Sequence, residues 1–137
     1  MSDSIVKQVA QKKQLGDFTK HDKLRFRAYQ FTIEEIFTIL QTELDDLPEP
    51  DLQEYKRGLN EIGGGFYDLY TSSISGALKK DIIQPLLDKA GTKLSTAISF
   101  KSQGREEEYL DRLKECRSLL FDLKEYLMTI NFDKPSS

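Results

Sequence analysis

The clearest pattern in the sequence lies between Arg105 and Asn131, where apolar residues recur at alternating steps of four and three. They are Tyr109, Leu113, Cys116, Leu120, Leu123, Leu127 and Ile130. Most residues between them are charged, which is typical of a helix that packs one apolar face against other helices. The pattern therefore predicts a long amphipathic helix. It indicates an architecture and no particular chemistry.

A second helical pattern begins at Thr19, which with Asp22 resembles a capping box, and runs to about Leu47. Its apolar positions are Phe26, Tyr29, Ile33, Ile36, Phe37, Leu40, Leu44 and Leu47. Further apolar residues, among them Phe31 and Ile39, widen this arc beyond one packing seam. Such a helix is either central to a bundle or has a second face on another subunit. We expect Phe26, Phe31 and Ile39 to be the residues that face a partner.

A third pattern follows the proline-rich break at residues 47–51 and contains three consecutive glycines. Its apolar positions are Leu52, Tyr55, Leu59, Ile62, Phe66 and Leu69. The spacing stays helical across Gly63, Gly64 and Gly65, although each glycine costs about 1 kcal/mol in a helix interior. We expect a continuous helix in which the triplet is a close-packing or hinge site. The alternative, a phosphate-binding loop, lacks the preceding strand and the following Lys-Ser/Thr.

The remaining segment predicts one more helix and completes the fold. Gln84-Pro85 is a favourable helix start, and small apolar residues such as Ala90 and Ala97 continue the pattern until a break before Gly104. The short connections make successive helices antiparallel neighbours. The sequence thus predicts an all-α protein, an antiparallel up-down four-helix bundle over residues 19–131. A short N-terminal helical arm precedes it at residues 1–18, and a polar tail follows at residues 132–137.

Composition narrows the class of protein. The chain of 137 residues has the size of one domain, and no apolar run approaches the ~20 residues of a membrane span. Its only cysteine is Cys116, and the N-terminal residues lack the apolar core of a secretory signal. We therefore expect a cytoplasmic protein that has no membrane association.

Charge is segregated along the chain, although the net charge is only −3. Residues 1–30 hold seven basic and three acidic residues, whereas residues 31–70 hold two basic and ten acidic residues. Such segregation can serve head-to-tail contacts between copies or the docking of a polyanion. It can equally reflect antiparallel helices that place opposite charges side by side in solvent.

Residues capable of catalysis are few and poorly placed. His21 is the only histidine, and it lies in the first turn of a helix, where an exposed structural residue is expected. A bundle-core metal site needs carboxylates paired with several histidines, which one histidine cannot supply. Cys116 falls within an apolar seam, where a thiol is a poor nucleophile. We expect no enzymatic activity, no catalytic residue, no metal or other cofactor, and no small-molecule substrate.

The strongest signal for binding is the basic segment at residues 20–29. Lys20, Lys23, Arg25 and Arg27 lie there among aromatic residues, and Lys20, Lys23 and Arg27 are spaced to form one exposed ridge. Such a ridge can follow a phosphate backbone without reading bases, or it can contact an acidic protein partner. A plain solvated surface remains the third interpretation.

These patterns together favour a non-catalytic protein-interaction module, a small helical subunit or adaptor. Its partners would be copies of itself or components of a larger complex. The alternative is a helical accessory subunit of a nucleoprotein complex that contacts RNA or DNA backbone through the N-terminal basic ridge.

Overall fold

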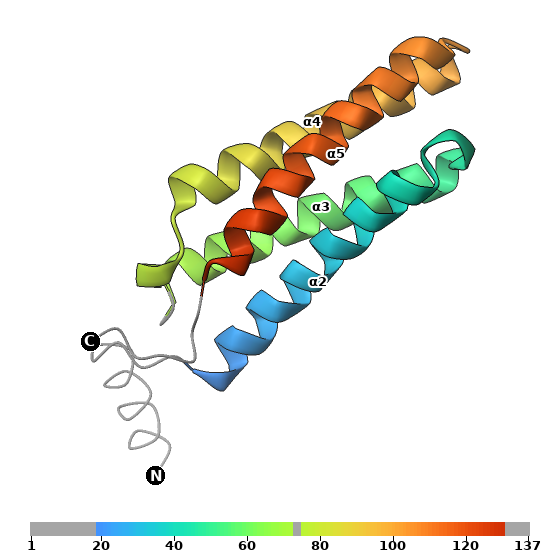
Figure 1. The fold of residues 1–137 in the computed structure, drawn as a ribbon. Coiled ribbons are helices and arrows are strands. Elements are labelled where there is room, and N and C mark those ends of the chain that lie inside the picture. Colours follow the sequence, from blue (N-terminus) through green and yellow to red (C-terminus); the bar gives the residue numbers. More distant parts are fainter. Residues whose placement is uncertain (1–18, 73–74, 131–137) are drawn as a thin grey trace.

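The chain folds as an all-α, up-down four-helix bundle in a computed structural model that describes residues 19–72 and 75–130. Helix α2 spans Lys20–Thr42, α3 spans Glu49–Tyr70, α4 spans Lys80–Ser102 and α5 spans Glu106–Met128. The short 3-10 helices η1, Leu44–Asp46, and η2, Ser75–Ala77, lie in two of the connections. Figure 1 shows the four long helices side by side and antiparallel in chain order. The predicted N-terminal arm and polar tail lie outside the described residues.

Each long helix packs against two neighbours, and the four contacts close into a ring. Helix α2 contacts α3, α3 contacts α4, α4 contacts α5, and α5 returns to α2. Because α2 and α5 are neighbours in space, segments at opposite ends of the described chain form one surface of the bundle.

The start of α2 agrees with its capping signal, but its end differs from the sequence prediction. The backbone N–H of Asp22 donates to Oγ1 of Thr19 at 3.1 Å, which caps the first turn. The helix then ends at Thr42 and not near Leu47. The apolar spacing continued to Leu47 because η1 turns the chain while keeping that side chain in the core, at 3% exposure. Leu47 itself has an extended backbone, as expected for a residue that precedes proline.

Helix α3 passes through the glycine triplet without interruption, whereas α4 begins earlier than its proline indicated. Pro85 lies inside α4, five residues after Lys80, and not at the first helical position. The backbone N–H of Ile83 bonds to the carbonyl of Lys79, so the helical turn before the proline is formed. Helix α5 follows Gly104, whose φ of 71° reverses the chain in a conformation that glycine adopts readily.

The core contains the residues that the helical spacing selected. Six of the seven apolar positions of the C-terminal pattern lie in α5 and are fully buried: Tyr109, Leu113, Cys116, Leu120, Leu123 and Leu127. Small residues of α4, Ala90 and Ala97, are also fully buried and allow the large side chains of neighbouring helices to approach. Within the described ranges, no helix is long and apolar enough to cross a membrane.

Candidate interaction surface

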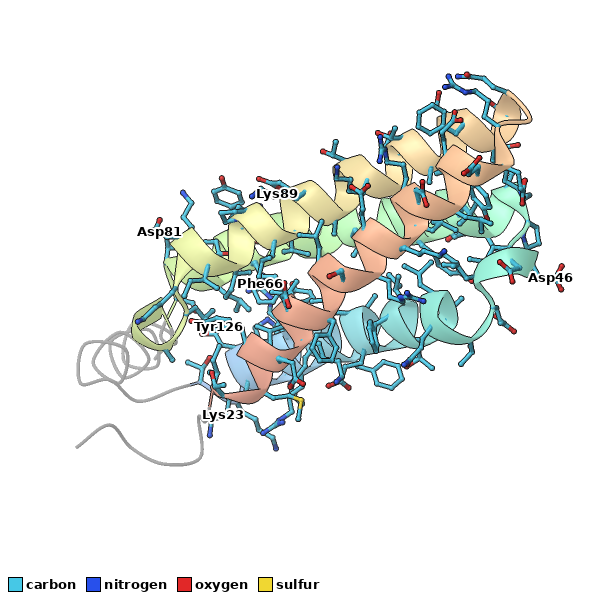
Figure 2. The ribbon with its side chains drawn as sticks, turned by 45° about the horizontal axis from the view of Figure 1, so that its top comes forward. Lys23, Asp46, Phe66, Asp81, Lys89 and Tyr126 are labelled. Carbon is cyan, nitrogen blue, oxygen red and sulfur yellow. The ribbon has the colours of Figure 1, made fainter. Side chains whose placement is uncertain are left out.

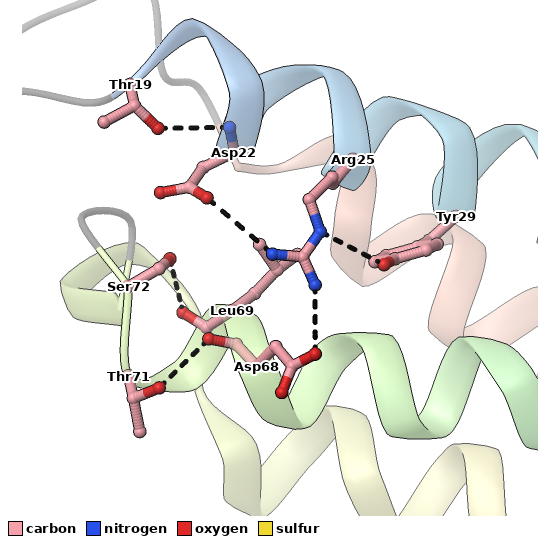
Figure 3. Close-up of polar contacts among 8 residues, drawn as sticks. All are labelled: Thr19, Asp22, Arg25, Tyr29, Asp68, Leu69, Thr71 and Ser72. Atoms are coloured by element: carbon pink, nitrogen blue, oxygen red, sulfur yellow. Dashed lines mark hydrogen bonds and ion pairs between the residues drawn. The ribbon is translucent and has the colours of Figure 1, made fainter.

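The structure places Arg25 apart from the three cations of the predicted ridge, Lys20, Lys23 and Arg27. Its Nε donates to the hydroxyl of Tyr29 at 3.4 Å, and its Nη2 donates to Oδ2 of Asp68 on α3 at 3.2 Å (Figure 3). A longer ion pair of 3.9 Å joins it to Asp22. Arg25 is therefore a contact between α2 and α3, and its role in binding a polyanion or an acidic partner stays a prediction. Its position on the side of α2 that faces α3 explains the contact.

The remaining ridge cations lie along the outer side of α2. Lys20 and Arg27 are exposed, and Lys23 is half-buried. Their steps of three and four residues keep them on one side of the helix, so they can act together on a charged partner.

The three apolar residues expected to face a partner have three different environments. Phe26 is 1% exposed and packs edge-to-face against Phe66, with ring centroids 6.2 Å apart. It belongs to the core and is unavailable to a partner, which corrects that expectation. Ile39 is partly buried against the core. Phe31 is 64% exposed, because it lies on the opposite side of α2 from Phe26 and Ile33.

The three glycines of the triplet also have different surroundings. A Cβ placed on Gly65 would overlap the ring and hydroxyl of Tyr29, so this glycine permits a close approach of α2 to α3. A Cβ on Gly63 would lie 3.7 Å from Nε2 of Gln84, an ordinary contact. A Cβ on Gly64 would meet no described atom within 4 Å. Only Gly65 is required by packing within the chain.

Gly63 and Gly64 line a groove of about 580 Å³ between α3 and α4. The buried side chain of Gln84 lies at its edge, where its Oε1 accepts from the Tyr70 hydroxyl at 3.1 Å and its Nε2 donates to Asp88 at 3.2 Å. The bond to Tyr70 joins α4 to α3, whereas the bond to Asp88 lies within α4. The polar atoms of Gln84 are thus satisfied within the bundle and do not require a ligand.

A second groove, of about 430 Å³, lies between α2 and α5. Its lining residues are Phe37, Gln41, Lys114, Arg117, Ser118 and Phe121. The rings of Phe37 and Phe121 have centroids 5.7 Å apart, and Nζ of Lys124 lies 5.5 Å and 5.4 Å from these two centroids. An ammonium at this distance from two rings is held by cation–π attraction, so the groove combines an aromatic floor with fixed positive charge.

The two helices that form this groove also carry exposed apolar side chains, of which Phe121 lines the groove itself. Leu24 and Phe31 lie two turns apart on α2 and are 60% and 64% exposed, while Phe121 and Met128 lie two turns apart on α5 and are 42% and 59% exposed. They are four of the six large apolar side chains that residues 19–72 and 75–130 expose. Sequence reasoning missed Phe121 and Met128. The available signal was their seven-residue spacing outside the leucine seam of α5.

We call this surface the α2–α5 face, defined by the flanking residues Leu24, Phe31, Phe121 and Met128 and by the groove residues Phe37, Gln41, Lys114, Arg117 and Ser118. Lys20, Lys23 and Arg27 follow its α2 side, and Lys124 lies on its α5 side. Glu34 and Glu125 are acidic residues near it. The face therefore carries exposed apolar side chains together with basic and acidic residues, exposed Asp122 and Glu125 among the acidic ones.

Neither His21 nor Cys116 lines either groove. His21 is exposed in the first turn of α2. Cys116 is fully buried, and burial raises the pKa of its thiol to about 12, which keeps it protonated at neutral pH. Across the described part of the chain, no cluster of three or more His, Cys, Asp or Glu residues is arranged to hold a metal ion. The α2–α5 face offers binding contacts of low chemical reactivity.

Comparisons with protein-family models, curated proteins and solved structures find no match for this chain.

Proposed function

We propose that this chain is a non-catalytic protein-interaction module, a small helical subunit or adaptor that oligomerises or docks in a larger assembly through the α2–α5 face. One observation carries the proposal: four large apolar side chains are exposed along two adjacent helices. Burying such a side chain is worth about 1.5–3 kcal/mol, so a partner that covers the face gains substantially. A cytoplasmic location suits the single, buried Cys116.

Sedimentation and crosslinking of the full chain test this proposal. The protein and its binding partners from the native source are isolated with the unaltered chain and with the double variants Leu24→Ser/Phe31→Ser and Phe121→Ser/Met128→Ser. We expect a complex larger than the monomer, crosslinked at α2 and α5, that both variants lose. The matched control is Tyr67→Ser/Ile82→Ser, which removes the other two exposed apolar side chains and should retain the complex. A monomer with no crosslink at α2 or α5 contradicts the proposal.

The alternative function is contact with RNA or DNA backbone, favoured by the spacing of Lys20, Lys23 and Arg27 beside the exposed ring of Phe31. Cations at this spacing release counterions from a nucleic acid, so binding should weaken steeply with salt. A gel-shift titration of single- and double-stranded RNA and DNA tests it. A shift at low salt that disappears on charge reversal of these three cations supports the alternative, and no shift at low salt excludes it.

A further inference from the structure

We propose that α2 makes a symmetric, antiparallel contact with α2 of a second copy of this chain. The contact uses five exposed residues on the outer side of the helix, which we call the α2 outer row: Lys20, Leu24, Ala28, Phe31 and Glu35. This inference rests on the proposed interaction function and specifies its partner. Two features carry it, the exposure of the row and an order of residues that is complementary to itself.

The α2 outer row points away from the core of the bundle. Its members follow one another at steps of three or four residues, which places them on one side of a helix. Leu24 and Phe31 are 60% and 64% exposed, whereas Phe26 and Ile33 on the opposite side are 1% and 0% exposed. The row is therefore a partly apolar helix face that no helix in the described ranges covers.

The order of residues along the row is self-complementary. When two α2 helices lie antiparallel about a two-fold axis between residues 27 and 28, Leu24 faces Phe31 of the second copy. Lys20 then faces Glu35 of the second copy, and the symmetry repeats both contacts. An isologous contact of this kind needs only one patch whose two halves fit each other. The row meets that requirement with an apolar pair and a charged pair on each side of the axis.

Ala28 lies beside the proposed axis, between the two large apolar side chains. Its small side chain allows the helices to approach to an interaxial distance of about 8 Å, the short end of the usual range. Helix α5 lacks this arrangement, because exposed Glu125 lies between its apolar pair, Phe121 and Met128. The same pairing of two α5 helices would bring two Glu125 carboxylates together, and they repel each other. The contact therefore belongs to α2.

The charges at the two ends of the row select the antiparallel orientation. A parallel pairing would place lysine opposite lysine and glutamate opposite glutamate, which is repulsive at both ends. Exposed ion pairs add little affinity, so the apolar pairs supply most of the attraction and the charges set the direction. Lys23 and Arg27 have interactions within the chain, and the contact does not depend on them.

The size of the contact sets the expected strength. One helix from each copy makes a small interface, and interfaces below about 1,200 Å² in total are typical of weak or transient association. Sedimentation equilibrium of the full chain at concentrations from about 5 to about 500 µM should therefore show a monomer–dimer equilibrium within that range.

Apolar variants test the location of the contact in the same experiment. Leu24→Ser/Phe31→Ser should raise the dissociation constant of the dimer about ten-fold or more, as expected for interface anchors. The matched control, Tyr67→Ser/Ile82→Ser, alters exposed apolar residues on α3 and α4 and should change it less than about two-fold. Circular dichroism and thermal unfolding confirm that each variant folds.

A charge exchange tests whether the partner is a second copy. Lys20→Glu should weaken the dimer about five-fold or more at about 50 mM NaCl, because each dimer exchanges two attractions for two repulsions. Lys20→Glu/Glu35→Lys should restore the dissociation constant to within about two-fold, since both pairs are then opposite in sign again. Only a partner that carries the same two substitutions can be rescued in this way.

Crosslinking tests the orientation. Ala28→Cys places two thiols beside the axis, and a bismaleimide with a short spacer should join them. The matched control is Thr38→Cys, on the same side of α2, whose two thiols would be about 30 Å apart along an antiparallel pair and should not be joined. The native Cys116 is fully buried and does not compete for the reagent.

Several outcomes overturn the inference, and they differ from failure of the proposed function. A monomer at every concentration, or a dimer that Leu24→Ser/Phe31→Ser leaves unchanged, overturns the α2 contact. Equal crosslinking at positions 28 and 38 overturns the antiparallel orientation, and no rescue by the charge exchange overturns the pairing of Lys20 with Glu35. A chain that is monomeric alone but enters a larger complex through the α2–α5 face retains the proposed function with a different partner.

Discussion

Three consecutive glycines of α3 have three different surroundings, although they are identical in sequence. Gly65 lies against the end of the Tyr29 side chain, Gly63 lies at a normal distance from Gln84, and Gly64 has no described atom where a Cβ would be. Glycine costs helix stability at each position because its backbone loses the most freedom on folding. Only the contact with Tyr29 offsets that cost within the bundle.

Alanine substitutions at Gly64 and Gly65 should therefore differ in their effect on the free energy of unfolding. Gly64→Ala should raise the free energy of unfolding by about 1 kcal/mol, because it adds helix propensity in open space. Gly65→Ala gains the same propensity but displaces Tyr29, so it should be less stable than Gly64→Ala by about 1–3 kcal/mol. Urea denaturation of both variants measures the difference.

A Tyr29→Ala background isolates the cause of this difference. Without the Tyr29 ring, Gly65→Ala should raise the free energy of unfolding by as much as Gly64→Ala does. A difference that persisted without the ring would show that the overlap with Tyr29 is not its origin.

The hydroxyl of Tyr109 gives a second prediction at the scale of one residue. Tyr109 is fully buried in α5, and its hydroxyl has no hydrogen-bond partner among the described residues. An unsatisfied buried hydroxyl costs about 1–3 kcal/mol. Tyr109→Phe should therefore raise the free energy of unfolding by about 1 kcal/mol, measured by urea denaturation, while Nζ of Lys101 keeps its place 4.6 Å above the ring. A loss of stability would instead indicate a buried water bound to the hydroxyl.

At the scale of elements, apolar spacing was sufficient to predict the long helices and the side of each helix that is buried in the core. The α5 seam of Tyr109 to Leu127 was predicted residue by residue, because a buried helical stripe needs a regular repeat. Helix ends were less predictable. The apolar step from Leu40 to Leu47 continues through a 3-10 turn, and Pro85, a good first residue, occupies a later position where the preceding turn is already formed.

The site could be predicted only in part, because it depends on pairs of helices. Arg25 belongs to the basic segment at residues 20–29, yet its guanidinium contacts Asp68 on α3, which no pattern within α2 reveals. Phe26 and Phe31 both belong to the wide apolar arc predicted for α2. Which of the two is buried depends on where α3 and α5 pack against that helix. The role of Phe121 is visible only in the structure, where its ring contacts that of Phe37 and α5 packs beside α2.

The early start of α4 leads to a prediction for Pro85. A proline inside a helix removes one backbone hydrogen bond, here to the carbonyl of Asp81, and its ring crowds that carbonyl. Pro85→Ala should therefore raise the free energy of unfolding by about 1–3 kcal/mol, measured by urea denaturation with the helical signal followed by circular dichroism. Pro50→Ala is a matched control, because Pro50 lies in the first turn of α3, where its missing N–H costs little. Destabilisation by Pro85→Ala would mean that the proline starts the helix.

For the whole molecule, the antiparallel arrangement of the helices determines where the charges that are segregated along the sequence lie in space. Figure 2 shows Asp46 and Lys23 near opposite ends of the bundle. The acidic residues of the α2–α3 connection are thus kept away from the basic start of α2. Segregation of charge in the sequence thus becomes a difference between the two ends of the bundle.

The bundle as a whole should lose stability at alkaline pH, because it buries weak acids in their neutral forms. Burial raises the pKa of Cys116 from 9.0 to about 12 and that of Tyr109 from 10.0 to about 12, and it also raises the pKa of Tyr70. In each case the folded pKa exceeds the unfolded one. The stabilisation is therefore complete below about pH 9 and is lost as pH rises from 9 towards 12.

Cys116 should account for the first part of this loss. Between pH 9 and 10 the thiol is the most ionised of these groups in the unfolded chain, so it alone should lower the free energy of unfolding by up to about 1.4 kcal/mol per pH unit. Urea denaturation at intervals of about half a pH unit measures the slope for the unaltered chain and for Cys116→Ala. The variant loses some packing at every pH, but its slope between pH 9 and 10 should be shallower, because it has no thiol to ionise. Equal slopes would show that the thiol is not protected from ionisation by the α5 seam, and the loss would then belong to the tyrosines, whose protons leave the unfolded chain nearer pH 10.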